Sequence, residues 1–234
     1  MKTIALVVSL LLIVFSGSRQ TSKVVQFNIG KILNARPVTT IVNRKMKTWT
    51  KGIDGNGAGD GYLTKSAAAF NGDQDAHALP DDPMITATEN HPQIQLHYSN
   101  TDGHPMQAHA FNDEDELEFP VASGQYNAVY LALTSAEGAS NIRIRLNYAS
   151  DFVSHDFVVP DYWADIKAGD PDFCYLLHDL AKWGPHNNMT EKDHHNIDLL
   201  KIPANPNWKL KSISISKTKP GYLVLWAAAG VKAE

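Results

Sequence analysis

Cysteine is almost absent from this chain of 234 residues, because Cys174 is the only one. An intramolecular disulfide is therefore excluded, and the fold must be held by a sizeable hydrophobic core. The chain also lacks an excess of basic charge: 21 Lys and Arg residues stand against 25 Asp and Glu residues, which gives a formal net charge of −4. This balance argues against bulk nucleic-acid binding.

Familiar catalytic signatures are missing as well. The sequence contains no G-x-S-x-G motif, no P-loop, no G-x-G-x-x-G motif and no C-x-x-C pair. The acidic run from Asp113 to Glu118 does not replace them, because adjacent carboxylates on one edge cannot straddle a glycosidic bond. Such a dense run of like charge normally stays solvated. These absences favour a binding protein over an enzyme.

Long apolar runs are confined to the start of the chain. Lys2 precedes an apolar stretch over residues 4–15, interrupted only by Ser9, and small residues follow at positions 16–18. The stretch is shorter than the roughly 20 residues that cross a bilayer as a helix. We therefore predict a signal peptide over residues 1–18, removed on export, rather than an uncleaved anchor. The mature protein is expected to be extracellular, or periplasmic in a Gram-negative bacterium, without a membrane span.

The rest of the hydrophobic pattern has mostly a period of two, which indicates β-strands. Residues 141–148 alternate almost perfectly between apolar and polar side chains. Residues 222–229 are apolar on both faces, which predicts a central strand covered on both sides. Residues 173–183 suit either a short helix or a covered strand. Further strands are expected over residues 25–29, 128–133, 152–159 and 210–216.

Turn dipeptides such as Asp102-Gly103, Glu137-Gly138 and Pro220-Gly221 separate these runs. Short alternating strands divided by turns predict an all-β fold, an antiparallel β-sandwich or jelly roll. Neither an internal repeat nor a low-complexity linker divides the chain, so residues 19–234 are expected to form a single domain.

The order of several strand sequences points to a family. YNAVYLALTS is followed by IRIRLNY, then FVVPDYW, KLKSISIS and a last apolar strand, YLVLWAAA. This series resembles secreted β-sandwich domains of the galactose-binding-like superfamily, which include carbohydrate-binding modules attached to glycosidases. The resemblance covers roughly residues 120–230. It implies a non-catalytic, carbohydrate-binding protein whose ligand site is formed by loops, many of them from residues 19–119.

A glycine-rich segment over residues 53–64 is the first candidate site. Asp54, Asn56 and Asp60 alternate there with glycines, and their hard oxygen ligands suit Ca²⁺. The EF-hand pattern is not met, because Lys65 stands where a bidentate Glu is needed. A surface loop rich in turn formers is the alternative. The family resemblance favours a structural calcium ion near such a loop.

Sugar recognition needs aromatic rings flanked by hydrogen-bonding groups. Trp49, Tyr62 and Trp183 are the candidate ligand-binding residues, because Trp49 and Trp183 stand in polar loop contexts. Trp208 is a weaker candidate, and Trp163 is expected in the core.

A small secreted enzyme on the same scaffold is the alternative function. The chain has 10 histidines, and the near-neutral pKa of imidazole suits acid–base catalysis. His97, or His178 with Asp179, would then serve a lyase, isomerase or hydrolase. A third reading is an adhesion protein with a protein ligand. If the host is eukaryotic, Asn188 in the sequence Asn188-Met189-Thr190 is a glycosylation acceptor. The oligomeric state stays open.

Overall fold

A computed structural model describes residues 23–54, 59–73, 76–101, 106–112, 115–218 and 221–233. The predicted signal peptide, residues 1–18, lies outside these ranges. Within them, no helix has both the length and the apolar character needed to span a membrane.

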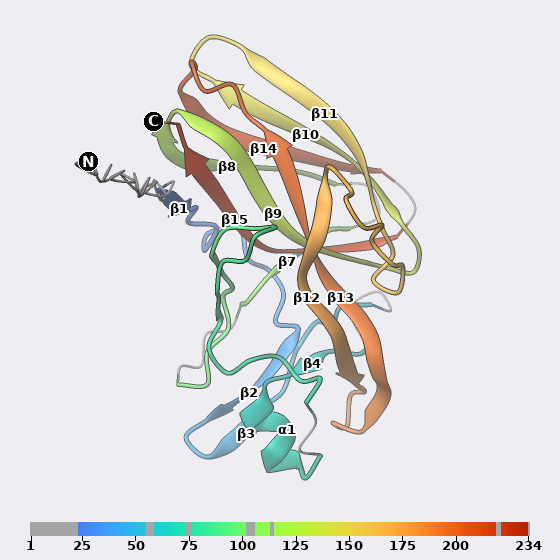
Figure 1. Ribbon diagram of the computed structural model, residues 1–234. Coiled ribbons are helices and arrows are strands. Elements are labelled where there is room, and N and C mark those ends of the chain that lie inside the picture. Colours follow the sequence, from blue (N-terminus) through green and yellow to red (C-terminus); the bar gives the residue numbers. More distant parts are fainter. Residues whose placement is uncertain are drawn as a thin grey trace, which may run out of the picture.

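Two antiparallel sheets form the upper part of the molecule in Figure 1. The first sheet has the order β1-β15-β9-β13-β12, with β7 also paired to β15, and the second has the order β11-β10-β14-β8. The first contains β1 (Val24–Gln26), β7 (His109–Ala110), β9 (Tyr126–Ala136), β12 (Phe173–Trp183), β13 (Met189–Pro203) and β15 (Tyr222–Lys232). The second contains β8 (Asp115–Gly124), β10 (Ser140–Tyr148), β11 (Phe152–Val159) and β14 (Leu210–Thr218). The predicted all-β, antiparallel architecture is confirmed, and residues 173–183 are a strand.

The space between the two sheets is filled by the alternating apolar residues. Ile142, Ile144 and Leu146 of β10 are buried, whereas Arg143 on the same strand is exposed. They pack against residues of the first sheet such as Leu131. Each fully buried aliphatic side chain contributes about 1.5–3 kcal/mol. The period of two seen in the sequence is therefore the register that builds this core.

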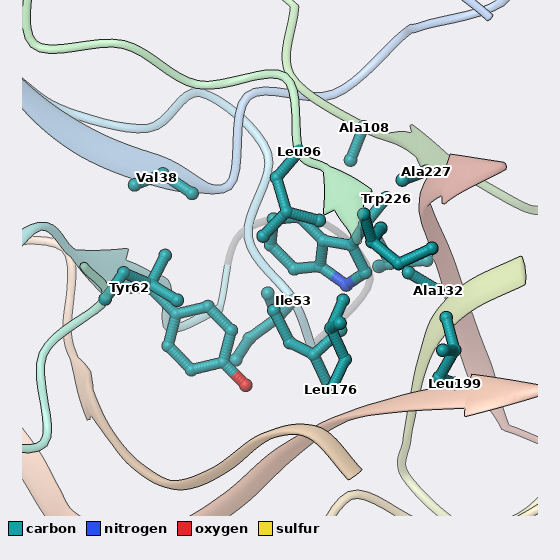
Figure 2. Close-up of a cluster of buried hydrophobic side chains, with 14 of the residues drawn as sticks. Val38, Ile53, Tyr62, Leu96, Ala108, Ala132, Leu176, Leu199, Trp226 and Ala227 are labelled. Carbon is teal, nitrogen blue, oxygen red and sulfur yellow. The ribbon is translucent and has the colours of Figure 1, made fainter. Parts of the chain in front are cut away.

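The opposite face of the first sheet is covered by the N-terminal half of the chain. Trp226 of β15 lies there, with its ring centroid 5.9 Å from that of Tyr62. Figure 2 shows the Trp226 indole among Ile53, Leu96 and Leu176. Every residue of β15 from Tyr222 to Gly230 is buried. The prediction of a strand covered on both faces is confirmed.

The covering segments are short. They are β2 (Val38–Val42), β3 (Lys45–Lys47), β4 (Tyr62–Leu63), α1 (Lys65–Asn71), β5 (Met84–Ile85) and β6 (Ile94–Gln95). Thr64 caps α1 by accepting from the Ala67 amide, and Gly72 ends it with a φ of 92° that only glycine adopts freely. β12 and β13 extend beyond the other strands to reach this region (Figure 1), where Gly61 bridges to Trp183.

Candidate functional site

The pairing of β12 with β13 is interrupted near the middle of both strands. The register shifts between Tyr175, Leu177 and Leu180 on the β12 side. Two residues in this interrupted region have left-handed backbones, Asp179 with φ 55° and His194 with φ 76°. Bulges re-aim side chains and are frequent beside active sites, and unusual backbone conformations of non-glycine residues concentrate at functional sites. This irregularity marks the candidate site.

The bulges bring four polar side chains together at the surface. The Asp179 carboxylate lies 3.1 Å from Nδ1 of His178 and 4.0 Å from Nδ1 of His194. On its other side, Nε2 of His194 lies 3.3 Å from the Asp193 carboxylate. The exposed fractions of the four side chains are 42–62%. Hydrogen-bonding groups of both kinds are therefore open to a ligand.

Trp163 stands beside this polar group with half of its surface exposed (50%). Its ring centroid is 5.5 Å from that of His194, and it meets the ring of buried His195 edge-on at 5.3 Å. The expectation that Trp163 belongs to the core is wrong. Strand β11 ends at Val159, and in the following turn Tyr162 is buried in place of its neighbour.

A largely buried set of polar and charged groups adjoins Trp163 through His195. We term it the Lys182 cluster, and it comprises Lys182, Asp54, Asp60, Glu191, Tyr162 and His195. Nζ of Lys182 lies 2.9 Å from Glu191 Oε1, 3.1 Å from Asp54 Oδ2 and 3.8 Å from Asp60 Oδ2. The ammonium also donates to Tyr162 Oη at 3.1 Å. The Tyr162 ring stacks on His195 at 4.7 Å. The surface site thus rests on a connected polar network.

Protonation in the Lys182 cluster follows from these contacts. Burial alone would lower the pKa of Lys182, but hydrogen bonds to Glu191 and Tyr162 and the charge of Asp54 outweigh it and raise that pKa. Burial raises the pKa of Tyr162 to about 12, so its hydroxyl keeps its proton. Burial lowers the pKa of His195, and the nearby Lys182 charge acts in the same direction.

His195 has a fixed tautomer. Its Nδ1 lies 2.9 Å from the Leu180 carbonyl oxygen, which only accepts, so Nδ1 carries the proton. Its Nε2 then faces Glu191 Oε2 at 3.1 Å, and neither of these buried atoms has an aligned hydrogen-bond partner among the described residues. The Leu180 hydrogen bond and the rings of Tyr162 and Trp163 fix the position of this imidazole.

Two of the three predicted calcium ligands, Asp54 and Asp60, lie against Lys182. Oδ1 of Asp54 accepts from the Asp60 amide at 2.7 Å, and Oδ2 of each carboxylate faces the Lys182 ammonium. The ammonium group only donates, so it would compete with a bound cation for these oxygens. Asn56, the third predicted ligand, lies outside the described residues. In the described part of the segment, Lys182 supplies the positive charge beside these two carboxylates.

Two of the three aromatic residues predicted to bind a ligand are buried, and the third is half-buried. Trp183 is fully buried against α1, and its Nε1 donates to Asp73 Oδ2 at 2.7 Å. Tyr62 is fully buried beside Trp226. Trp49 is half-buried, and a Cβ on Gly61 would lie only 2.7 Å from its ring. The rings of Trp183 and Tyr62 are therefore not available to a sugar in this structure.

Among the predicted acid–base residues, the structure pairs His178 with Asp179, whereas His97 lies half-buried after β6, on another segment. Asn188 is exposed in the turn between β12 and β13. The Thr190 hydroxyl, the third residue of that sequence, donates to Asp60.

Next to the bulges, a pocket of about 690 Å³ is formed largely by residues 88–91 and 166–176, and His178 lines its margin. Comparison with known proteins finds no matching family model and no curated protein of significantly similar sequence.

Proposed function

We propose that this protein is a secreted, non-catalytic, carbohydrate-binding β-sandwich of the jelly-roll, galactose-binding-like type. One observation carries the proposal: the half-exposed Trp163 ring contacts His194, which in turn lies 4.0 Å from Asp179 on a bulged pair of strands. The strand orders β7-β15-β9-β13 and β8-β14-β10-β11 support the jelly-roll type, because most neighbouring strands in each sheet are far apart in the chain.

The chemistry of the site suits a sugar. An indole ring offers an apolar surface for the C–H face of a pyranose, and its polar neighbours fix the orientation of the ligand. Asp179 and Asp193 accept hydrogen bonds from hydroxyl groups, whereas an imidazole offers a donor and an acceptor. Because His195 braces Trp163 from below, little ordering entropy is lost on binding.

The charges of the site favour neutral or amino sugars over acidic ones. Asp179 and Asp193 are both partly exposed beside Trp163, and the Lys182 cluster beneath has three carboxylates to one ammonium. A uronic acid would meet like charge here, which costs affinity.

A glycan array on residues 19–234 tests the proposal, with Trp163→Ala as the site variant. Trp208→Ala is the matched control, because Trp208 is also exposed (39%) but packs elsewhere, against Tyr148. We expect Trp163→Ala to lose at least about tenfold in affinity, the scale of one lost aromatic contact, and Trp208→Ala to bind like the parent. Silence across the array, or equal binding by both variants, refutes the proposal.

Secretion is part of the same proposal. Mass spectrometry of the exported product is expected to show a mature chain that begins near Arg19. In a eukaryotic host, peptide mapping is expected to find a glycan on Asn188, which is exposed. An intact N-terminus on a membrane-bound product would contradict the secretion proposal.

The His178–Asp179 pair favours one second candidate, an acid–base enzyme, because a carboxylate 3.1 Å from an imidazole orients it for proton transfer. One measurement distinguishes a binding protein from an enzyme. A binder leaves a bound oligosaccharide intact over a day, whereas an enzyme converts it, and His178→Ala abolishes the conversion.

A further inference from the structure

The pocket beside the bulges extends the candidate site along β12. Its volume of about 690 Å³ lies within the ~300–1,000 Å³ typical of small-molecule sites. Residues 166–173 form one wall and residues 88–91 another, and Lys201 of β13 also lines it.

Trp163, His194, Asp179 and Asp193 form what we term the Trp163 surface. It is continuous with the pocket through the rings of His178 and Tyr175. His178 lines the pocket and also contacts Asp179, which belongs to the Trp163 surface. The His178 ring lies 4.2 Å from the ring of Tyr175, another lining residue. A ligand that leaves Trp163 and passes Asp179 therefore enters the pocket over His178 and Tyr175.

The pocket wall has a defined shape. The Tyr175 hydroxyl accepts from the Ile166 amide at 2.8 Å, which ties the loop after β11 to β12. Oδ1 of Asp170 accepts from the amides of Asp172 and Phe173 at 3.0 and 2.9 Å. These bonds within the loop hold the pocket open to a ligand before binding, which lowers the cost of association.

The lining is mixed in charge. Glu89, Asp170 and Asp172 are offset by Lys167 and Lys201, and Ile166 and Leu176 add apolar surface. Such a surface has no strong preference for an anion or a cation, and it combines apolar contact with many hydrogen-bonding groups. A neutral polyhydroxylated group matches it.

We propose that the ligand is a glycan chain of at least two sugar units. One unit lies over Trp163, and the next enters the pocket past His178 and Tyr175. This inference rests on the proposed carbohydrate-binding function and adds to it a preference for chains over single sugars.

Calorimetric titration with neutral β-1,4-linked gluco-, manno-, xylo- and galacto-oligosaccharides of one to four units tests the inference. We expect the affinity of the preferred series to rise at least about tenfold from one unit to two or three. The pocket variants Tyr175→Ala and Lys201→Ala are expected to lower the affinity for the chains towards that of the single sugar, with single-sugar binding unchanged. Lys211→Ala, an exposed lysine of β14 outside the pocket, is the control. Because Tyr175→Ala removes a loop contact, Lys201→Ala keeps the test valid if the first variant misfolds.

Different results would refute the preference for chains and the carbohydrate-binding function. If affinity is the same for one unit and for four, and the pocket variants bind like the parent while Trp163→Ala does not bind, the chain preference is refuted and the carbohydrate-binding function stands. If Trp163→Ala binds every length like the parent, the proposed function itself is refuted.

Discussion

Nζ of Lys182 lies 3.1 Å from Oδ2 of Asp54, and this contact joins positions 128 residues apart in the chain. It ties the glycine-rich segment in the N-terminal half to the long strand β12. Both side chains are almost fully buried, with 8% and 10% of their surface exposed. Removing one partner of a buried ion pair is costly, because the other charge stays behind in a medium of low polarity.

Lys182→Ala is therefore expected to destabilise the fold by about 3–5 kcal/mol. Its three carboxylate neighbours, Asp54, Asp60 and Glu191, would be left without their cation. Urea denaturation followed by tryptophan fluorescence measures the loss. Lys211→Ala, exposed on β14, is the control and should change little. A loss below about 1 kcal/mol would mean that the cluster behaves as a surface ion pair.

A chelator is expected to leave the melting temperature of the parent protein unchanged, because an ammonium holds the Asp54 and Asp60 carboxylates. In Lys182→Ala the same carboxylates are free to bind a cation, so added Ca²⁺ should raise the melting temperature of the variant alone. Differential scanning calorimetry with EDTA and then with Ca²⁺ decides the matter. Strong destabilisation of the parent by EDTA would show that this description of the segment is wrong.

Asp198 predicts a dependence of stability on pH. The residue is fully buried on β13, and neither carboxylate oxygen has a hydrogen-bond partner within the described part of the chain. Burial, with a smaller effect from Asp161, raises its pKa to about 8, whereas an unfolded Asp has a pKa of about 3.9. The folded state therefore retains a proton that the unfolded state releases. From this group, the free energy of unfolding should fall between about pH 4 and 8, by at most about 1.4 kcal/mol per pH unit, and level off above.

Asp198→Asn removes this titration, so the variant should gain stability relative to the parent as pH rises from 5 to 9. Urea denaturation across that range measures the difference. Asp156→Asn is the matched control, because Asp156 is exposed and paired with Arg143. Parallel pH profiles for the parent and Asp198→Asn would show that the carboxyl is not held protonated.

Substitution of Trp183 should lower mainly the stability of the fold, whereas substitution of Trp163 should lower mainly the affinity for a glycan. Trp183→Ala removes a fully buried ring and its bond to Asp73, and is expected to cost about 3–5 kcal/mol. Trp163→Ala, with half of the side chain in solvent, should cost less than about 1 kcal/mol of stability while it lowers glycan affinity at least about tenfold. Denaturation and array binding of both variants check this. Equal stability losses would remove the distinction between the structural and the ligand-binding tryptophan.

The strands of the all-β fold could be predicted from the sequence, because a strand that buries one face must alternate between apolar and polar side chains. Residues 152–159 were predicted as a strand and form β11, and the doubly apolar residues 222–229 lie within β15, which is covered on both faces. Residues 173–183 stayed open between helix and strand, since short apolar runs satisfy both periods. In the folded protein, antiparallel pairing with β13 makes residues 173–183 a strand.

Most residues of the candidate site could not be predicted from the sequence. His178 and Asp179 were singled out, but Trp163 was assigned to the core and is half-exposed, whereas Trp183 was assigned to a ligand surface and is fully buried. A polar context marks a loop, yet it does not tell which segment will later cover that loop. Trp183 is buried because α1, far away in the chain, packs on it.

Hydrophobic periodicity, charge balance and turn residues are local properties, and they were sufficient for strands and for an antiparallel, all-β fold. The meeting of Lys182 with Asp54, the bulges that expose Asp179 and His194, and the pocket past Tyr175 depend on which distant segments share an edge. No local pattern encodes such contacts, because burial and bulge position are fixed only when the whole core packs.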